Sequence, residues 1–503
     1  MNQKFLNITL GFTILLFLYS LWYRVVDVDD AWLAEHAYWL SELGYVKSEL
    51  MRGITQQEVR VLLHHKLLIG LGALSIEVFG LSVYVLKSIT LLCFGGFLWL
   101  FYRFMVVEKE YFNKLDFGFA VLILLSHHLV FKYAFVYRPE VMMLLWGFIS
   151  FIFLNRTYDN PSFKNTGLSG LFAAFCLLTH LNGIAFLGAG FLCLALERQW
   201  KSTIYFGLIG GLTCLFYFWD FTHEYNLAFW FDQLNNNPYH KTPFGTQLLI
   251  NLFTEQSRFF HSPIEFALSV LLITGFMISY PILKREQARL LRYTGLLIFF
   301  IALISLYKTT KYMIPYLPYL VTMIVLAWKH LFSSDFQPPK RLQRFSTLQI
   351  RQFFWLLIIL YLGIQHFFNF RLIGKNGDIS HNANLRETFV QTPIPKTKVI
   401  APMDFIFNEI ELFERIQSEL SFSELQKANP NLKGAVFLQQ AYEQDIDYIF
   451  LSKDFQETLG VKNYDNPIFK DYYQHGGYGL KGIMVLENIK ISNSKLQVPK
   501  TNN

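Results

Sequence analysis

The sequence predicts an all-α polytopic membrane domain with about 11 transmembrane helices, followed by a small C-terminal α/β domain. Three observations carry this prediction. Apolar residues make up 53% of the 503 residues, including 52 Phe, which exceeds the usual content of soluble domains. A first apolar run covers about 5–23, and many more follow it. After about residue 372 the composition becomes charged and polar.

The apolar runs are long enough to cross a hydrocarbon core of about 30 Å. The first run lacks a small-residue cleavage site, so we expect a retained signal-anchor and not a removed signal peptide. We expect the spans at about 5–23, 82–102, 116–136, 140–154, 166–181, 183–196, 203–219, 263–283, 293–307, 312–331 and 352–370.

Basic residues between these spans fall on one side of the predicted topology. The positive-inside rule assigns that side to the cytoplasm. The same bias explains the net charge of +7 without a nucleic-acid partner. The residues are Arg103, Lys109, Lys114, Arg156, Lys164, Arg198, Lys201, Lys284, Arg285, Arg289, Arg292, Lys329, Lys340, Arg341, Arg344 and Arg351.

The opposite, outer side carries a first loop (24–80), a second loop (220–262) and the segment 372–503. The first loop is acidic and has helical apolar spacing over 31–43 and 67–79, the latter too short to span and suited to the membrane interface. Its acidic pair, Asp29 and Asp30, comes a few residues after the first span. We expect these carboxylates at the mouth of a membrane-embedded cavity.

The chain divides into a membrane domain, 1–371, and an outer domain, 372–503, large enough for a modest core of its own. Short β-type runs lie at 398–401, 448–451 and 482–486, and helical patterns lie at 404–420 and 434–444. No catalytic constellation is visible in this outer domain.

Five sequence elements occur in the order typical of one enzyme superfamily, although none of them is specific alone. They are Asp29-Asp30-Ala31-Trp32, Leu43-Gly44-Tyr45, Lys66 with Val78-Phe79-Gly80, Arg138-Pro139-Glu140, and Lys308-Thr309-Thr310-Lys311-Tyr312-Met313-Ile314-Pro315. In this order the chain resembles the integral-membrane glycosyltransferases of the GT-C superfamily, over about 5–370. Within that superfamily it is most similar to a bacterial branch that resembles glycosyltransferase family 39. This branch is related to the protein O-mannosyltransferases and to the lipid A aminoarabinose transferase. It departs from that pattern in lacking prolines after Lys66 and in having Glu140 where the family has Asp.

The resemblance implies transfer of a hexosyl or pentosyl group from a polyprenyl-phosphate donor to an acceptor, on the outer face of a bacterial inner membrane. An acceptor hydroxyl needs a base, and cations stabilise the leaving phosphate. By resemblance Asp29 is the expected base, and Asp30 orients the acceptor or shares that role. The expected donor phosphate-binding residues are Lys66, Arg138, Lys308 and Lys311. The expected cavity-lining residues are His64, His65, Glu140, His180 and Tyr312.

Several alternatives stay open at this level. Lys and Arg at span ends often snorkel to the interface without any catalytic role. Adjacent histidines are poorly spaced for a metal, so we expect no metal site and no required cofactor. A transporter or flippase of a lipid-linked or amphipathic solute is the alternative function, and a non-catalytic scaffold is another. The sugar and the acceptor, whether glycan, lipid or protein, are not specified by the sequence.

Overall fold

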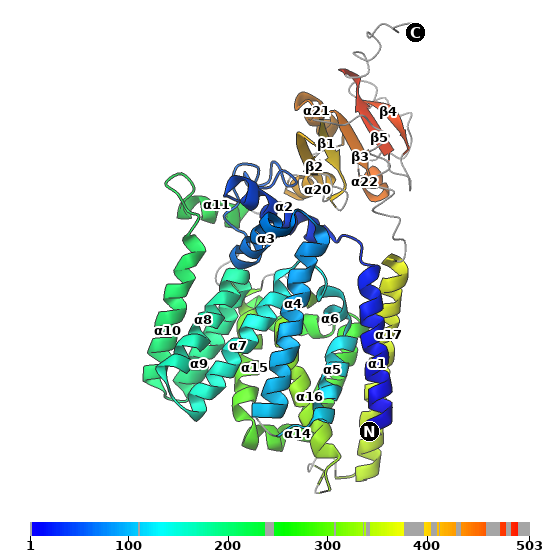
Figure 1. The fold of residues 1–503 in the computed structure, drawn as a ribbon. Helices are drawn as coiled ribbons and strands as arrows, with labels where there is room; N and C mark the ends of the chain where they lie inside the picture. The colour runs from blue at the N-terminus through cyan, green and yellow to red at the C-terminus, as the bar shows by residue number, and fades with distance from the viewer. Residues whose placement is uncertain are drawn as a thin grey trace.

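The protein is mostly helical and carries a small β-sheet near its C-terminus (Figure 1). In this computed structural model we describe 3–108, 111–236, 246–305, 308–334, 336–338, 343–376, 397–403, 410–411, 413–428, 434–458, 473–478 and 484–490.

Six helical segments among the described residues are long and apolar enough to cross a membrane. This confirms the prediction of a multi-pass membrane protein. The segments are α1 (Gln3–Trp22), α4 (Val83–Tyr102, continued by the π-helical η1, Arg103–Glu108), α7 (Pro139–Asp159), α14 (Pro263–Glu286), η4 with α16 (Thr310–Tyr316 and Leu317–Leu331) and α17 (Thr347–Asn376).

The other expected spans are observed as shorter helices, so the count of about eleven spans stays a prediction. These helices are α5 (Lys114–Ser126), α6 (His128–Tyr133), α8 (Phe163–Thr179), α9 (Ile184–Leu196, preceded by η2, Leu181–Gly183), α10 (Trp200–Cys214, extended by η3, Leu215–Phe218) and α15 (Ala288–Ile304). The last residues of the span expected at 293–307 lie outside the described residues.

The segment predicted as one continuous span, 116–136, is interrupted at His127. That residue has an extended backbone (φ −59°, ψ 121°) and separates α5 from α6. The break leaves backbone groups that lipid cannot satisfy, and α17 supplies their partners. Asn369 donates to the carbonyl of Ser126 at 2.8 Å, and the side-chain oxygen of Gln365 accepts from the amide of His128 at 2.8 Å.

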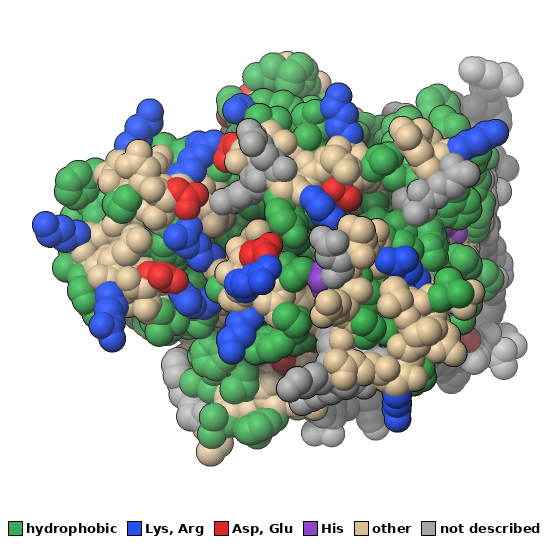
Figure 2. All heavy atoms as spheres, turned by 90° about the horizontal axis from the view of Figure 1, so that it is seen from below, with side chains coloured by type: hydrophobic (Ala, Val, Ile, Leu, Met, Phe, Trp, Pro, Cys, Tyr) green, Lys and Arg blue, Asp and Glu red, His purple; other side chains and the backbone are tan. Residues whose placement is uncertain are grey.

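The two ends of the helical bundle carry different parts of the chain. The end that carries α2, α3 and the sheet is called the domain end (Figure 1). The opposite end, seen in Figure 2, exposes many Lys and Arg side chains and is called the basic end. Alternation of helix direction brings the basic residues of the predicted cytoplasmic loops to this end, including Lys114, Arg156, Lys201, Arg285 and Lys329.

The first outer loop contains the two helices that the sequence predicts, α2 (Val28–Leu43) and α3 (Lys66–Phe79). Asp27 is the N-cap of α2 and forms a capping box with Asp30, so the acidic pair lies in the first helical turn and not in the loop before it. Gly44 ends α2 with φ +73°, a left-handed conformation that favours glycine.

The second outer loop forms short helices, α11 (Leu227–Asn236), α12 (Thr246–Phe253) and α13 (Gln256–Phe259). The part of this loop at 237–245 lies outside the described residues.

The C-terminal sheet has the strand order β2-β1-β3-β5-β4. Strand β1 is parallel to β2 and β3, and β5 is antiparallel to β3 and β4. The bounds are β1 Lys398–Ala401, β2 Arg415–Ser418, β3 Tyr448–Leu451, β4 Tyr473–Tyr478 and β5 Met484–Asn488, with helices α20 (Glu419–Ala428), α21 (Gly434–Glu443) and α22 (Lys453–Thr458).

Two details of this region differ from the sequence prediction. The helix expected over 404–420 is wrong at its end, because 415–418 pairs in register with β1 as an edge strand and buries Ile416. The expected boundary at 371/372 falls inside α17, which runs on to Asn376. The rest of the expected helix, 404–409, lies outside the described residues.

Candidate active site

Asp29 lies at the domain end, in the first turn of α2, with 28% of its side chain exposed. Its Oδ2 atom forms an ion pair with Arg138 and lies 3.8 Å from Nζ of Lys311. Among the described residues, the other carboxylate oxygen, Oδ1, accepts no hydrogen bond. Asp29 is thus a half-buried carboxylate with two cations beside Oδ2 and no hydrogen-bond donor on Oδ1.

Arg138 connects Asp29 to a second carboxylate. It is the N-cap of α7, and its fork donates to Glu140 from Nε at 3.0 Å and from Nη2 at 2.8 Å. Burial alone would lower the pKa of Arg138, but Glu140 and Asp29 outweigh it and hold the pKa well above the ordinary range. The guanidinium therefore stays charged and rigidly placed. Pro139 at the first position of α7 fixes the entry of the chain into the helix.

Three aromatic side chains lie beside this charge cluster. The imidazoles of His65 and His180 stack with ring centroids 4.8 Å apart, and Nε2 of His180 lies 3.3 Å from the hydroxyl of Tyr312. Nδ1 of His180 accepts from the amide of Asn182 at 2.9 Å, so in the neutral ring Nε2 carries the proton and donates to Tyr312. Burial and His180 lower the pKa of His65 well below its usual value, which keeps His65 neutral.

Seven of the predicted site residues are therefore brought together at the domain ends of α7 and η4, which belong to the two most buried spans. Lys311 and Tyr312 are neighbours in η4, so the ion pairs around Asp29 and the ring contacts of His180 form one cluster. We call it the Asp29 cluster; its members are Asp29, Arg138, Glu140, Lys311, Tyr312, His180 and His65.

Lys66 and His64 belong to a second, buried group. Lys66 Nζ donates to both oxygens of Asp220, at 2.7 and 2.8 Å, and to the carbonyl of Leu62 at 3.0 Å. His64 Nε2 lies 3.6 Å from Asp220. Burial lowers the pKa of Lys66 to about 8, although Asp220 opposes the shift. The ammonium group is occupied by Asp220 in this conformation, so its predicted role in phosphate binding stays a prediction.

Lys308 belongs to a third group, with residues of α13. Its Nζ donates to Glu255 at 2.9 Å and to the carbonyl of Ala302 at 2.8 Å. Glu255 also pairs with Arg258 at 3.1 Å, and the guanidinium of Arg258 lies 5.6 Å from the ring centroid of Tyr312. This group therefore adjoins the Asp29 cluster, and the predicted phosphate ligand Lys308 is held by an internal carboxylate.

Asp30 is fully buried and its oxygens are all used. Oδ2 accepts from the amide of Asp27 at 2.8 Å and pairs with Lys87 of α4 at 2.9 Å, and Oδ1 accepts from the amide of Tyr137 at 2.6 Å. These contacts fasten the start of α2 to α4 and to the segment before Arg138. We therefore expect Asp30 to position Asp29 and Arg138, and not to contact the substrate.

Sequence reasoning missed the partners that organise these groups, namely Lys87, Asp220 as a partner of Lys66, Glu255 and Arg258. Lys87 lies inside an apolar span, where a charged residue usually has a partner or a function. Its position in the sequence therefore indicates a buried ion pair. The others lie on short helices or helix ends whose packing the apolar pattern does not specify.

Glu35 organises the rest of the first outer loop from the middle of α2. Its Oε1 accepts from the Trp39 indole at 3.1 Å and from the amides of Glu49 and Leu50 at 2.6 and 3.1 Å, while Oε2 accepts from Ser48 at 2.6 Å. Leu50, whose amide donates to Glu35, also bonds to the C-terminal sheet: its carbonyl accepts from the amide of Ser418 at 3.1 Å. Glu35 thus links the helix that carries Asp29 to the segment on which the sheet docks.

We expect the first outer loop to become less stable as the pH rises from about 4.5 to about 7, because Glu35 loses its proton over this range. Burial raises the pKa of Glu35 to about 7, from an ordinary value near 4.5. The folded state therefore holds a proton that the unfolded state releases, and stability declines between these values and levels off above about pH 7. Glu35 should lower the free energy of unfolding by roughly 3 kcal/mol over this pH range. Melting curves of Glu35→Gln recorded across the same range should lack that part of the decline. Glu42→Gln, at an exposed position on the same helix, is the control. If the free energy of unfolding of Glu35→Gln depends on pH as steeply as that of the wild type, the raised pKa of Glu35 is contradicted.

Within the described ranges, no group of three or more His, Cys, Asp or Glu side chains is arranged to hold a metal ion. The independence from metals stays a prediction.

Comparison by sequence gave no match, either to the protein-family models or to curated proteins. Comparison of the structure did. The chain superposes on ArnT from Cupriavidus metallidurans bound to undecaprenyl phosphate with a TM-score of 0.60 and 11% sequence identity, covering 97% of this chain and 98% of that one. The apo state of the same enzyme gives a TM-score of 0.59 at 12% identity, over 96% and 97% of the two chains.

The apo oligosaccharyltransferase of Archaeoglobus fulgidus gives a TM-score of 0.53 at 12% identity, over 96% of this chain and 74% of that one. Both neighbours are GT-C glycosyltransferases. The chain has the GT-C fold. The resemblance deduced from five short sequence elements is thereby confirmed at the level of the fold. At this identity the GT-C fold places helices and the sheet, and the roles of individual residues rest on the geometry given above.

Proposed function

We propose that this protein is a membrane glycosyltransferase that moves a sugar from a polyprenyl-phosphate carrier to an acceptor, with Asp29 as the general base. One observation carries the proposal: Asp29 is a half-buried carboxylate with Oδ2 beside Arg138 and Lys311, and no described residue donates a hydrogen bond to its Oδ1. The GT-C fold, found also in an ArnT structure bound to undecaprenyl phosphate, supports this choice of donor class.

The reaction follows from this arrangement. The bond between the anomeric carbon and the phosphate oxygen breaks, and the bond from the acceptor oxygen to that carbon forms. The acceptor proton passes to Oδ1 of Asp29. The electron pair of the broken bond stays on the polyprenyl phosphate, whose added negative charge is stabilised by Lys311 and Arg138 in a site partly shielded from water. Glu140 keeps Arg138 in place during this step, because two parallel hydrogen bonds fix its guanidinium.

The location of the cluster fits a lipid-linked donor. It lies at the domain ends of α7 and η4, where a headgroup meets water while its polyprenyl tail remains among the apolar helices. Positive charge at the basic end supports an orientation with that end in the cytoplasm, so that the Asp29 cluster and the sheet face outwards (Figure 2). We accordingly propose the inner membrane of a bacterium as the location, with an active site on the periplasmic side.

Lys311→Ala is expected to weaken binding of undecaprenyl phosphate by roughly tenfold, because it removes a charged donor to the phosphate. Binding is measured by the rise in melting temperature with added lipid, or by native mass spectrometry. Lys47→Ala is the matched control, since Lys47 lies in the first outer loop with a similar exposure, 18% against 22%, and contacts Glu49 and the ring of Trp39, which lie outside the Asp29 cluster. Equal affinity in wild type and Lys311→Ala would remove Lys311 from the proposed donor site.

A further inference from the structure

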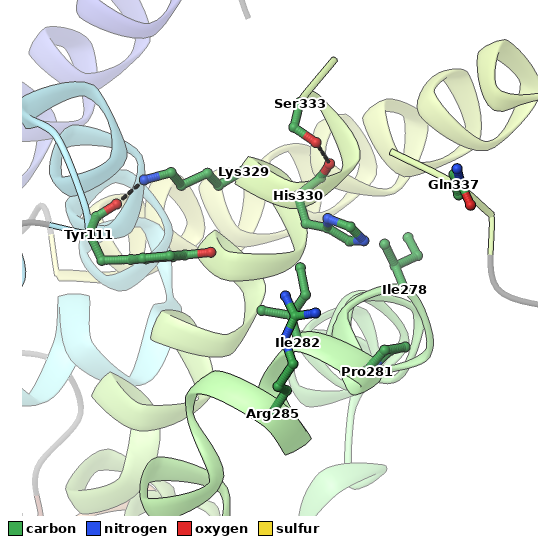
Figure 3. A pocket seen from close by; sticks show the side chains of 9 residues that line it. All are labelled: Tyr111, Ile278, Pro281, Ile282, Arg285, Lys329, His330, Ser333 and Gln337. Carbon is green, nitrogen blue, oxygen red and sulfur yellow. Dashed lines mark hydrogen bonds between the residues drawn. The ribbon is translucent and has the colours of Figure 1, made fainter. Parts of the chain in front are cut away.

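A cavity of about 440 Å³ opens at the basic end, far from the Asp29 cluster (Figure 3). Its walls come from α14, from the end of α16 and from Tyr111, which precedes α5. The volume is within the range of ordinary small-molecule sites. Nothing in the proposed transfer reaction uses it, so it calls for a separate explanation.

The mouth of the cavity carries two cations, Arg285 and Lys329. The side chain of Arg285 is 77% exposed and bonds only to its neighbour Glu286 in the described structure. Lys329 donates to the carbonyl of Tyr111, lies over the Tyr111 ring, and is 4.0 Å from Asp116, the limit of an ion pair. The exposed pair of Arg285 with Glu286 contributes little, so an arriving anion can replace Glu286 at small cost. The side chain of Lys329 is 36% exposed and can bond the anion while it keeps its contacts with Tyr111 and Asp116.

The other wall of the cavity is apolar and continues into the membrane face of α14. Ile278, Pro281 and Ile282 line the cavity, and Met277 and Ile273, one and two turns before Pro281 along α14, are exposed. Both α14 and the segment formed by η4 and α16 are long and apolar enough to cross a membrane, so the cavity lies where their ends meet the headgroup level. A cationic mouth above an apolar track matches a molecule with an anionic head and an acyl chain.

We propose that this cavity binds an anionic phospholipid of the surrounding leaflet, with its phosphate between Arg285 and Lys329 and an acyl chain along α14. Basic pockets between membrane helices are suited to such headgroups. A free phosphate ion satisfies the cations equally well but leaves the apolar wall and the exposed face of α14 without a role. The inference does not rest on the proposed glycosyl transfer.

The test measures lipid binding to the purified full-length protein by native mass spectrometry, with phosphatidylglycerol and phosphatidylcholine as probes. Wild type should prefer phosphatidylglycerol. The double variant Arg285→Gln/Lys329→Gln should lose roughly tenfold in affinity for it and keep its affinity for phosphatidylcholine. The control Lys164→Gln/Lys201→Gln removes two exposed charges at the same end, on α8 and α10, and should change binding by less than about twofold.

Three outcomes would overturn the proposal. Equal loss in the control variant would mean that diffuse surface charge attracts the lipid. Displacement of phosphatidylglycerol by excess inorganic phosphate, without any effect of chain length, would mean a soluble-anion site. If the double variant does not fold, the single variant Arg285→Gln serves, because its exposed side chain is dispensable for packing; unchanged binding in that variant also rejects the site.

Discussion

Asp29→Asn should lose sugar transfer by roughly 10²–10⁴-fold while remaining folded. Asn keeps the shape of the side chain and an oxygen that accepts from Arg138, but it cannot take the proton of the acceptor hydroxyl. Because 28% of the Asp29 side chain is exposed to solvent, we expect that the fold does not depend on its charge. The measurement is the rate of product formation from a polyprenyl-phosphate sugar in membranes of matched protein content.

Glu42→Gln is the matched control for this experiment, because it removes an exposed carboxylate from the C-terminal part of the same helix. It should retain wild-type transfer. Full activity in Asp29→Asn would reject Asp29 as the base. A variant that fails to fold would instead mean that the pairing with Arg138 holds the site together, which the melting temperature separates from a loss of chemistry.

Asp30→Asn should lower the free energy of unfolding by about 3–5 kcal/mol, the usual cost of leaving a buried charge without its partner. Lys87 would keep its charge beneath α2 without a counter-charge, bonded to the carbonyl of Val25 at 2.9 Å. The new amide nitrogen would face at least one of the donors that Asp30 accepts from. The start of α2 and the Tyr137 segment would loosen together, since both bond to Asp30. Thermal melting in detergent reports the loss.

The double variant Asp30→Asn/Lys87→Met removes both charges and should recover most of that stability. Its transfer activity per folded molecule then separates two roles. Activity near the wild-type value would show that Asp30 positions the site, as its burial indicates. An inactive but stable double variant would restore Asp30 to the chemistry, as the sequence resemblance suggested.

The fold was largely predictable because the bilayer imposes length and apolarity on each span. The prediction failed where local packing overrides that rule. The span over 116–136 breaks at His127, since Gln365 and Asn369, more than two hundred residues away, satisfy the opened backbone. Strand β2 was read as part of a helix, because a four-residue edge strand has too little sequence to show its own periodicity.

The site was predictable only in part. Motif order brought out the residues that the structure collects around Asp29, from α2, the start of α7 and η4. Partner choice was not visible in the sequence: Lys66 and Lys308 carry the expected charge, yet buried carboxylates at Asp220 and Glu255 engage them. Asp29 and Asp30 are adjacent and chemically identical, and only the three-dimensional structure shows one half-exposed and the other sealed beneath α2.

The central claim is the transfer of a sugar from a polyprenyl-phosphate carrier with Asp29 as base. It is tested most directly by mass spectrometry of carrier lipids and envelope glycans in a strain lacking this gene, complemented with wild type or with Asp29→Asn. The account predicts that a polyprenyl-phosphate sugar accumulates, that one glycan lacks that sugar, and that wild type alone restores it. Unchanged carrier and glycan pools, or full complementation by Asp29→Asn, would contradict the account and favour a transporter or a non-catalytic scaffold with the same fold.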